Sequence, residues 1–225
     1  MEDMNSLYLQ GFKIPKIMNP LGISFLSVLL CIFLAACKSG SGRVEEKEPA
    51  GEEEWHMTDE IKQVQIGPAE EDAFRQAALD GQLETLKELH KLGVGCDVID
   101  QDGHTALMLA AFNGHSEIVL YLLDSGAQID GRDYANRTAL HYASTGPFPE
   151  TVQILLDRGA DPNVVDSEEH FSPLMHAAAE GNLDVVKVLI AKGADKSLKD
   201  IDGDDAATFS AQNGHMQVVE YLNSL

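Results

Sequence analysis

The chain has 225 residues, enough for one ordinary domain with accessory segments, and 44% of them are apolar, which excludes a wholly disordered protein. It carries 37 acidic against 16 basic side chains, and the resulting net charge of −21 repels nucleic acid, so we expect no nucleic-acid partner. The cysteines Cys31, Cys37 and Cys96 define no disulfide framework, because two of them lie in or at the end of one apolar run.

The first element in chain order is an uncharged run from Leu21 to Ala36. A membrane-spanning helix needs about 20 predominantly apolar residues, and this run is shorter and interrupted by glycine and serine. Lys13 and Lys16 precede the run and small residues end it, which is the plan of a secretory signal. We therefore expect residues 1–36 to be a cleaved signal peptide, with an uncleaved span as the alternative.

The run ends in Leu34-Ala35-Ala36-Cys37, which resembles the lipobox of bacterial lipoproteins. The resemblance implies that Cys37 receives diacylglycerol, becomes the mature N-terminus and attaches the protein to a membrane. Lys38 stands where inner-membrane retention usually shows aspartate. The family's sorting rule thus implies an outer-membrane lipoprotein facing the periplasm, with an inner-membrane anchor or the cell surface as alternatives.

Residues 37–67 are rich in charge and, until their last third, poor in apolar side chains, which predicts a flexible acidic tether. About 30 flexible residues have a mean end-to-end distance of about 30 Å, enough to lift a domain clear of lipid headgroups. Trp55 is the only tryptophan and lies in this tether. Docking of Trp55 onto the first repeat and contact with a partner are both open.

The remainder of the chain is periodic. The segment "DGHTALMLAAFNGHSEIVLYLLDSGAQID" recurs as "ANRTALHYASTGPFPETVQILLDRGADPN", and two further copies follow. Thr105, Thr138, Ser172 and Asp205 mark equivalent positions, at steps of 33, 34 and 33 residues. A fixed period of this length predicts a solenoid of stacked units.

These repeats resemble the ankyrin repeat from about Asp72 to Leu225, over five units. The resemblance implies an all-α solenoid of helix-turn-helix units with short β-hairpin fingers, which we assign to residues 68–225. The four marker residues can cap helix starts, and glycines such as Gly114 can take the positive φ that ends a first helix. Apolar stripes such as Ile118 to Leu123 are predicted to face the core.

We find no catalytic constellation in the sequence. There is no nucleophile elbow, metal pair or phosphate loop, so we expect no enzyme, no cofactor and no metal. The acidic run from Asp200 to Asp205 resembles a calcium loop, but its glycine is misplaced and the closing glutamate is missing, so we interpret it as a hairpin turn. His115, His141 and His215 have structural roles in the family.

An aromatic-rich strip is the candidate binding surface. The residue four after each capping position is predicted to face outward from the stack, together with one further ring on the first of these helices and side chains from the fingers. The candidates are Leu109, Phe112, Tyr142, His176 and Phe209 on the helices, and His104, Tyr134, Arg137, His170 and Phe171 on the fingers. Exposed aromatic side chains often anchor protein interfaces. The alternative is that several of them pack against the neighbouring helix.

Taken together, the sequence predicts a lipid-anchored ankyrin-repeat protein that binds a protein partner at the bacterial cell envelope. Two alternatives are an inhibitor or immunity protein for an envelope-active toxin and an accessory factor for an envelope enzyme. Both alternatives also work through binding.

Overall fold

The computed structural model describes residues 66–225. The predicted signal peptide, Cys37 and nearly all of the predicted tether lie outside this range. Among the helices of residues 66–225, none combines the length and the apolar character that crossing a membrane requires.

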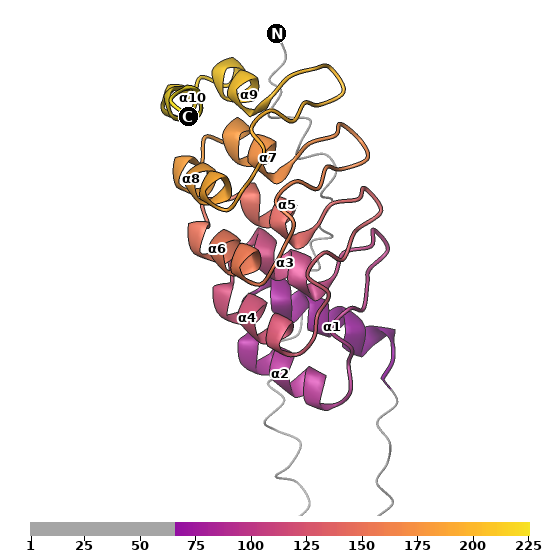
Figure 1. Cartoon of the computed structure of the whole chain (residues 1–225). Coiled ribbons are helices and arrows are strands. Elements are labelled where there is room, and N and C mark those ends of the chain that lie inside the picture. The colour runs from indigo at the N-terminus through magenta and orange to yellow at the C-terminus, as the bar shows by residue number, and fades with distance from the viewer. Residues whose placement is uncertain (1–65) are drawn as a thin grey trace, which may run out of the picture. The chain divides into compact units, whose positions relative to one another are not determined.

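Ten helices in the described residues form five successive helix-turn-helix pairs, joined by hairpin loops that we call fingers. The pairs are α1 (Pro68–Leu79) with α2 (Leu83–Lys91), α3 (Ala106–Phe112) with α4 (Ser116–Asp124), α5 (Ala139–Ser144) with α6 (Pro149–Asp157), α7 (Pro173–Ala179) with α8 (Leu183–Ala191), and α9 (Ala206–Gln212) with α10 (Met216–Asn223). The first helices of the pairs stack in one column and the second helices in another (Figure 1). The predicted all-α solenoid of five units is therefore confirmed.

The fingers extend from one side of the stack (Figure 1) and comprise residues 98–105, 131–138, 164–172 and 198–205. In the described residues, the only isolated β-bridge joins Ile99 to Thr105 in the first finger. The fingers are thus hairpin loops rather than regular strands.

Side chains fix the starts of the first helices. Thr105, Ser172 and Asp205 accept hydrogen bonds from the backbone N–H groups three residues further on, as predicted for N-caps. At Thr138 there is also a hydrogen bond in the opposite direction: the Thr138 backbone N–H donates to Nδ1 of His141 at 3.1 Å. His141 therefore carries its proton on Nε2, which donates to the Phe171 carbonyl at 3.2 Å and ties α5 to the next finger.

The turn inside a pair depends on close contact with the following pair. Gly81 has a φ of 75°, and an added Cβ there would lie 2.7 Å from the ring of His115. Nε2 of His115 lies 3.0 Å from the Leu79 carbonyl, which ends α1. His215 packs on Gly181 in the same way. The predicted structural role of these two histidines is confirmed, since each ring locks the preceding turn.

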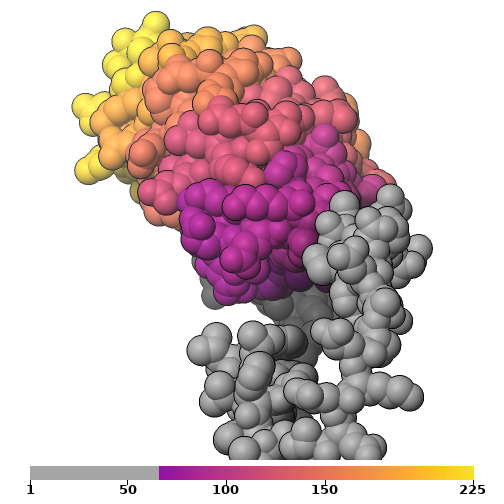
Figure 2. Space-filling view, turned by 90° about the horizontal axis from the view of Figure 1, so that it is seen from below, coloured from indigo at the N-terminus to yellow at the C-terminus, as the bar shows by residue number. Residues whose placement is uncertain are grey.

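The core is continuous along the stack. Ile118, Val119 and Leu122 on α4 are buried, and Leu123 is half-buried against them. Paired alanines such as Ala110 and Ala111 on α3 have no exposed surface, which lets α3 pack directly against α1 and α5. Figure 2 shows the successive pairs as adjoining layers along the chain. Each layer buries its apolar stripe against its neighbours, as expected for a solenoid.

We expect Leu122→Ala to lower the free energy of unfolding by about 2–5 kcal/mol, because the fully buried side chain leaves a cavity. Leu92→Ala is the matched control, since Leu92 is 49% exposed at the end of α2. Urea unfolding followed by circular dichroism measures both changes. Equal effects of the two variants would contradict the packing described above.

Candidate partner-binding surface

One aspartate in each finger organises its turn. Oδ1 of Asp100 accepts the backbone N–H groups of Asp102 and His104, at 2.9 and 2.8 Å. The equivalent residues, which accept two backbone N–H groups in the same way, are Asp133, Asp166 and Asp200. Burial alone would raise the pKa of Asp100, but the hydrogen bonds from His104 and Asp102 hold it below its usual value.

The shared role of these aspartates was missed in the sequence, although they follow the repeat period and Asp200 was noted as the start of an acidic run. The acidic run from Asp200 to Asp205 is confirmed as a hairpin turn, because Asp200 accepts the N–H groups of Asp202 and Asp204. In the first finger, ligand atoms of Asp100, Asp102 and His104 lie within 4.8 Å of one another. Because Asp100 is already engaged by the turn, this grouping is explained by the hairpin.

Neighbouring fingers are joined through their backbones. The Tyr134 N–H donates to the Asp102 carbonyl at 3.3 Å, and the Ile201 N–H donates to the Glu169 carbonyl at 3.1 Å. Between these two junctions, the Ser167 N–H donates to the Ala135 carbonyl at 2.9 Å. Each finger is therefore held beside the preceding one, and the four tips form one continuous edge.

Tyr142 belongs to a buried network rather than to an exposed strip. Its hydroxyl donates to Oδ2 of Asp133 at 2.6 Å, and Nε of Arg137 donates to the same oxygen at 2.9 Å. The Asp133 side chain is completely buried, and Tyr142 itself is 5% exposed. Burial, together with the hydrogen bond to Asp133, raises the pKa of Tyr142 far above its usual value. The hydroxyl therefore stays protonated and holds the finger on α5.

A second cluster of rings, partly buried, joins the fourth and fifth pairs. Phe171 packs against Phe209 with ring centroids 4.7 Å apart, and against His176 at 5.4 Å. His176 also meets His141 edge to face at 5.9 Å. Nε2 of His176 is buried with no hydrogen-bond partner in the described residues. Burial, with His141 and Arg137 nearby, lowers the pKa of His176 to about 3, and burial lowers that of His141 to about 4.

The expectation of an exposed aromatic strip is therefore wrong for four candidates that are 5–8% exposed: His104, Leu109, Tyr142 and Phe171. Tyr142 is enclosed by its own finger and by His104 and Phe112 of the preceding unit. Phe171 packs against Phe209 of the neighbouring pair, which agrees with the alternative considered above. The half-buried candidates are Phe112, His176, Phe209 and Arg137. Tyr134 and His170 are exposed. Partner contact through any of these residues stays a prediction.

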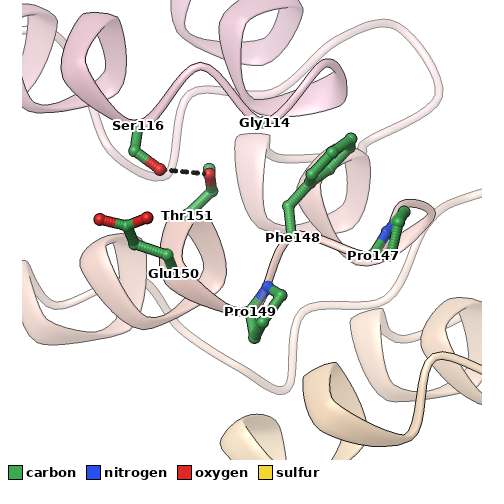
Figure 3. A pocket seen from close by; sticks show the side chains of 7 residues that line it. All are labelled: Gly114, Ser116, Pro147, Phe148, Pro149, Glu150 and Thr151. Atoms are coloured by element: carbon green, nitrogen blue, oxygen red, sulfur yellow. Dashed lines mark hydrogen bonds between the residues drawn. The ribbon is translucent and has the colours of Figure 1, made fainter.

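The unusual turn "TGPFPE" gives a shallow pocket elsewhere on the domain. Phe148 takes the place that the turn histidines occupy in other pairs, and its ring lies over Gly114, where an added Cβ would be 2.3 Å away. The hydroxyls of Ser116 and Thr151 meet at 2.9 Å beside it (Figure 3). The pocket has a volume of about 240 Å³, which is below the usual range for small-molecule sites. We assign it a packing role, since Phe148 closes the turn without the histidine's hydrogen bond.

We expect Tyr142→Phe to destabilise the domain by about 1.5–3 kcal/mol, because it removes a hydrogen bond to a buried carboxylate. The matched control is Tyr134→Phe, whose ring is 71% exposed and whose loss of the hydroxyl should change the free energy of unfolding little. Urea unfolding of both variants tests this. If Tyr142→Phe leaves the free energy of unfolding unchanged, the hydrogen bond to Asp133 contributes nothing to stability.

The burial of His141 and of the His176 ring nitrogen Nε2 predicts a loss of stability in acid. Unfolded histidine titrates near 6.5, whereas the folded pKa values are about 4 for His141 and about 3 for His176, so the unfolded chain binds more protons below about pH 6.5. The free energy of unfolding is therefore unaffected by the protonation of these two histidines above about pH 6.5, and it falls as the pH drops from there toward their folded-state pKa values. When the pH is lowered from 7 to 5, we expect the free energy of unfolding of the wild type to fall by about 2 kcal/mol more than that of the His176→Leu variant. Parallel pH profiles of unfolding free energy would contradict this.

Comparisons with known proteins agree with the repeat architecture. A family model described as ankyrin repeats (3 copies) matches residues 74–166 and 147–224. A probable E3 ubiquitin-protein ligase from Oryza sativa subsp. japonica is 43% identical over 51 residues, which are 23% of this chain and 10% of that protein. The aligned part of this chain thus corresponds to about a tenth of that relative's length. From the family match, which covers most of the described residues, the chain belongs to the ankyrin-repeat family.

Proposed function

We propose that this ankyrin-repeat protein is anchored by a lipid on Cys37 and holds a protein partner at the bacterial cell envelope. Ankyrin repeats are typically interaction modules without enzymatic activity, and the family match over residues 74–224 carries the interaction part of the proposal. The anchoring part rests on Leu34-Ala35-Ala36-Cys37 at the end of an apolar run. The acidic segment 37–67 then serves as the tether between lipid and repeats.

The shifted titratable groups of the described domain support a binding role. His141, Tyr142 and His176 owe their pKa shifts mainly to burial, and their contacts join helices to fingers. Catalytic groups with shifted pKa values lie where a substrate can reach them. The described groups instead stiffen the stack, which presents its finger edge as a rigid surface. Such a surface binds a partner with little loss of conformational entropy.

We expect Cys37→Ser to abolish lipidation and to leave an uncleaved precursor, because the thiol is the atom that takes the lipid. Palmitate labelling of the full chain in a bacterial host measures lipidation, and the intact mass shows whether the precursor is cleaved. Cys31→Ser is the matched control, since it removes a thiol from the same apolar run and should still be labelled. Labelling of Cys37→Ser, or a wild-type mass that retains residues 1–36, would overturn the anchor.

To identify the partner, the wild-type chain is purified from the detergent-solubilised envelope. The proteins that co-purify with it are compared with those that co-purify with the Cys37→Ser variant. The activity of a captured enzyme then separates three kinds of complex. Loss of activity in a tight stoichiometric complex indicates an inhibitor or immunity protein. Raised activity indicates an accessory factor, and unchanged activity indicates simple retention at the envelope.

A further inference from the structure

The tips of the fingers form an edge with a regular chemical composition. We define the tip row as the exposed residues Asp102, Tyr134, Glu168, Glu169, Ile201 and Asp202. The backbone hydrogen bonds between fingers place Tyr134 beside Asp102 and Ile201 beside Glu169. Each of these large apolar side chains therefore has an acidic residue directly next to it on the preceding finger.

Tyr134 and Ile201 are conspicuously exposed, at 71% and 56%. The Tyr134 ring leans on Gly103 of the preceding finger, since an added Cβ there would lie 3.2 Å from its Cδ1. It is thus held in place on the surface without being buried. Tyr134 and Ile201 lie on the second and fourth fingers, so the edge offers two separate apolar contact points with acidic residues beside them.

The carboxylates of the tip row form no close ion pair in the described residues, although Glu168 interacts electrostatically with Arg137. In residues 66–225, the carboxylates of Asp102, Glu168, Glu169 and Asp202 take part in no ion pair. Among the basic side chains of the fingers, Arg137 is paired with Asp133, whereas Arg132 and Lys199 donate to neutral oxygens and keep their charges. Acidic side chains nevertheless outnumber basic ones in the fingers. The row therefore presents net negative charge around its apolar side chains.

We infer that the tip row docks a cationic amphipathic polypeptide segment of the partner. Lysine or arginine side chains of that segment pair with the four carboxylates, while its apolar side chains cover Tyr134 and Ile201. Complementary charge steers such a segment to the row, and the apolar contacts hold it there. This inference rests on the proposed function, because it names the chemistry of the protein partner.

The test uses the full chain in phosphatidylcholine nanodiscs and three labelled synthetic peptides of equal length, built from lysine and leucine, lysine and serine, or glutamate and leucine. Fluorescence anisotropy, corrected with empty discs, gives the dissociation constants. We expect the lysine-leucine peptide to bind most tightly, and its affinity to fall as salt is raised. Equal binding of the glutamate-leucine peptide would overturn the inference.

Two double variants locate the site. Tyr134→Ser with Ile201→Ser, and Glu168→Gln with Glu169→Gln, should each weaken binding of the lysine-leucine peptide about tenfold or more. The matched controls are Met216→Ser, which removes a 64% exposed apolar side chain from α10, and Glu117→Gln with Glu220→Gln on α4 and α10. Controls that weaken binding as much as the tip variants would overturn the inference. Circular dichroism confirms that every variant is folded.

Failure of this inference differs from failure of the proposed function. The peptide assay does not depend on lipidation or on capture of a natural partner. If an envelope partner is captured but the lysine-leucine peptide binds no better than the others, the inference is overturned and the proposed function stands. If Cys37 is not lipidated but the tip variants lose peptide binding, the inference stands and the anchor is overturned.

Discussion

A single carboxylate in each finger sets the geometry of the domain. In the first finger Asp100 binds the N–H groups of Asp102 and His104, and the helix cap Thr105 follows immediately. The same order, from turn aspartate to second N–H donor to capping residue, occurs in all four fingers. Each carboxylate therefore decides where the next first helix begins. The helix columns and the edge of finger tips both depend on it.

The same interaction is adapted in two of the fingers. Asp133 is completely buried and also accepts hydrogen bonds from Arg137 and Tyr142, so the turn becomes part of the core. Such a buried charge is tolerated because its oxygens are paired. Asp166 accepts N–H groups three and five residues on, rather than two and four, which accommodates the additional residue in that finger. The finger is thus one residue longer, its tip carries Glu168, Glu169 and His170, and Ser172 still caps α7.

The sequence was sufficient to predict what depends on local spacing. Helix pairs, capping residues and turn glycines follow from side chains a few residues apart, and the structure confirms them. It was insufficient for exposure, because burial depends on how the finger folds back on the helix and on the neighbouring units of the stack. Tyr142 has the spacing of an outward-facing residue, yet a carboxylate nine residues earlier and the neighbouring helices enclose it. The turn aspartates follow the period, but among many acidic residues only their hydrogen bonds distinguish them.

The turn carboxylates hold backbone N–H groups, so the side chains at the tips contribute little to the fold. A residue such as Tyr134 or Ile201 can be replaced without disturbing the helix cap that follows it. In each finger, the carboxylate and backbone N–H groups thus serve folding, while the side chains at the tip are available for partner contact. During evolution, such a chain can acquire a new partner by successive changes at its tips, one finger at a time, while its core sequence stays fixed.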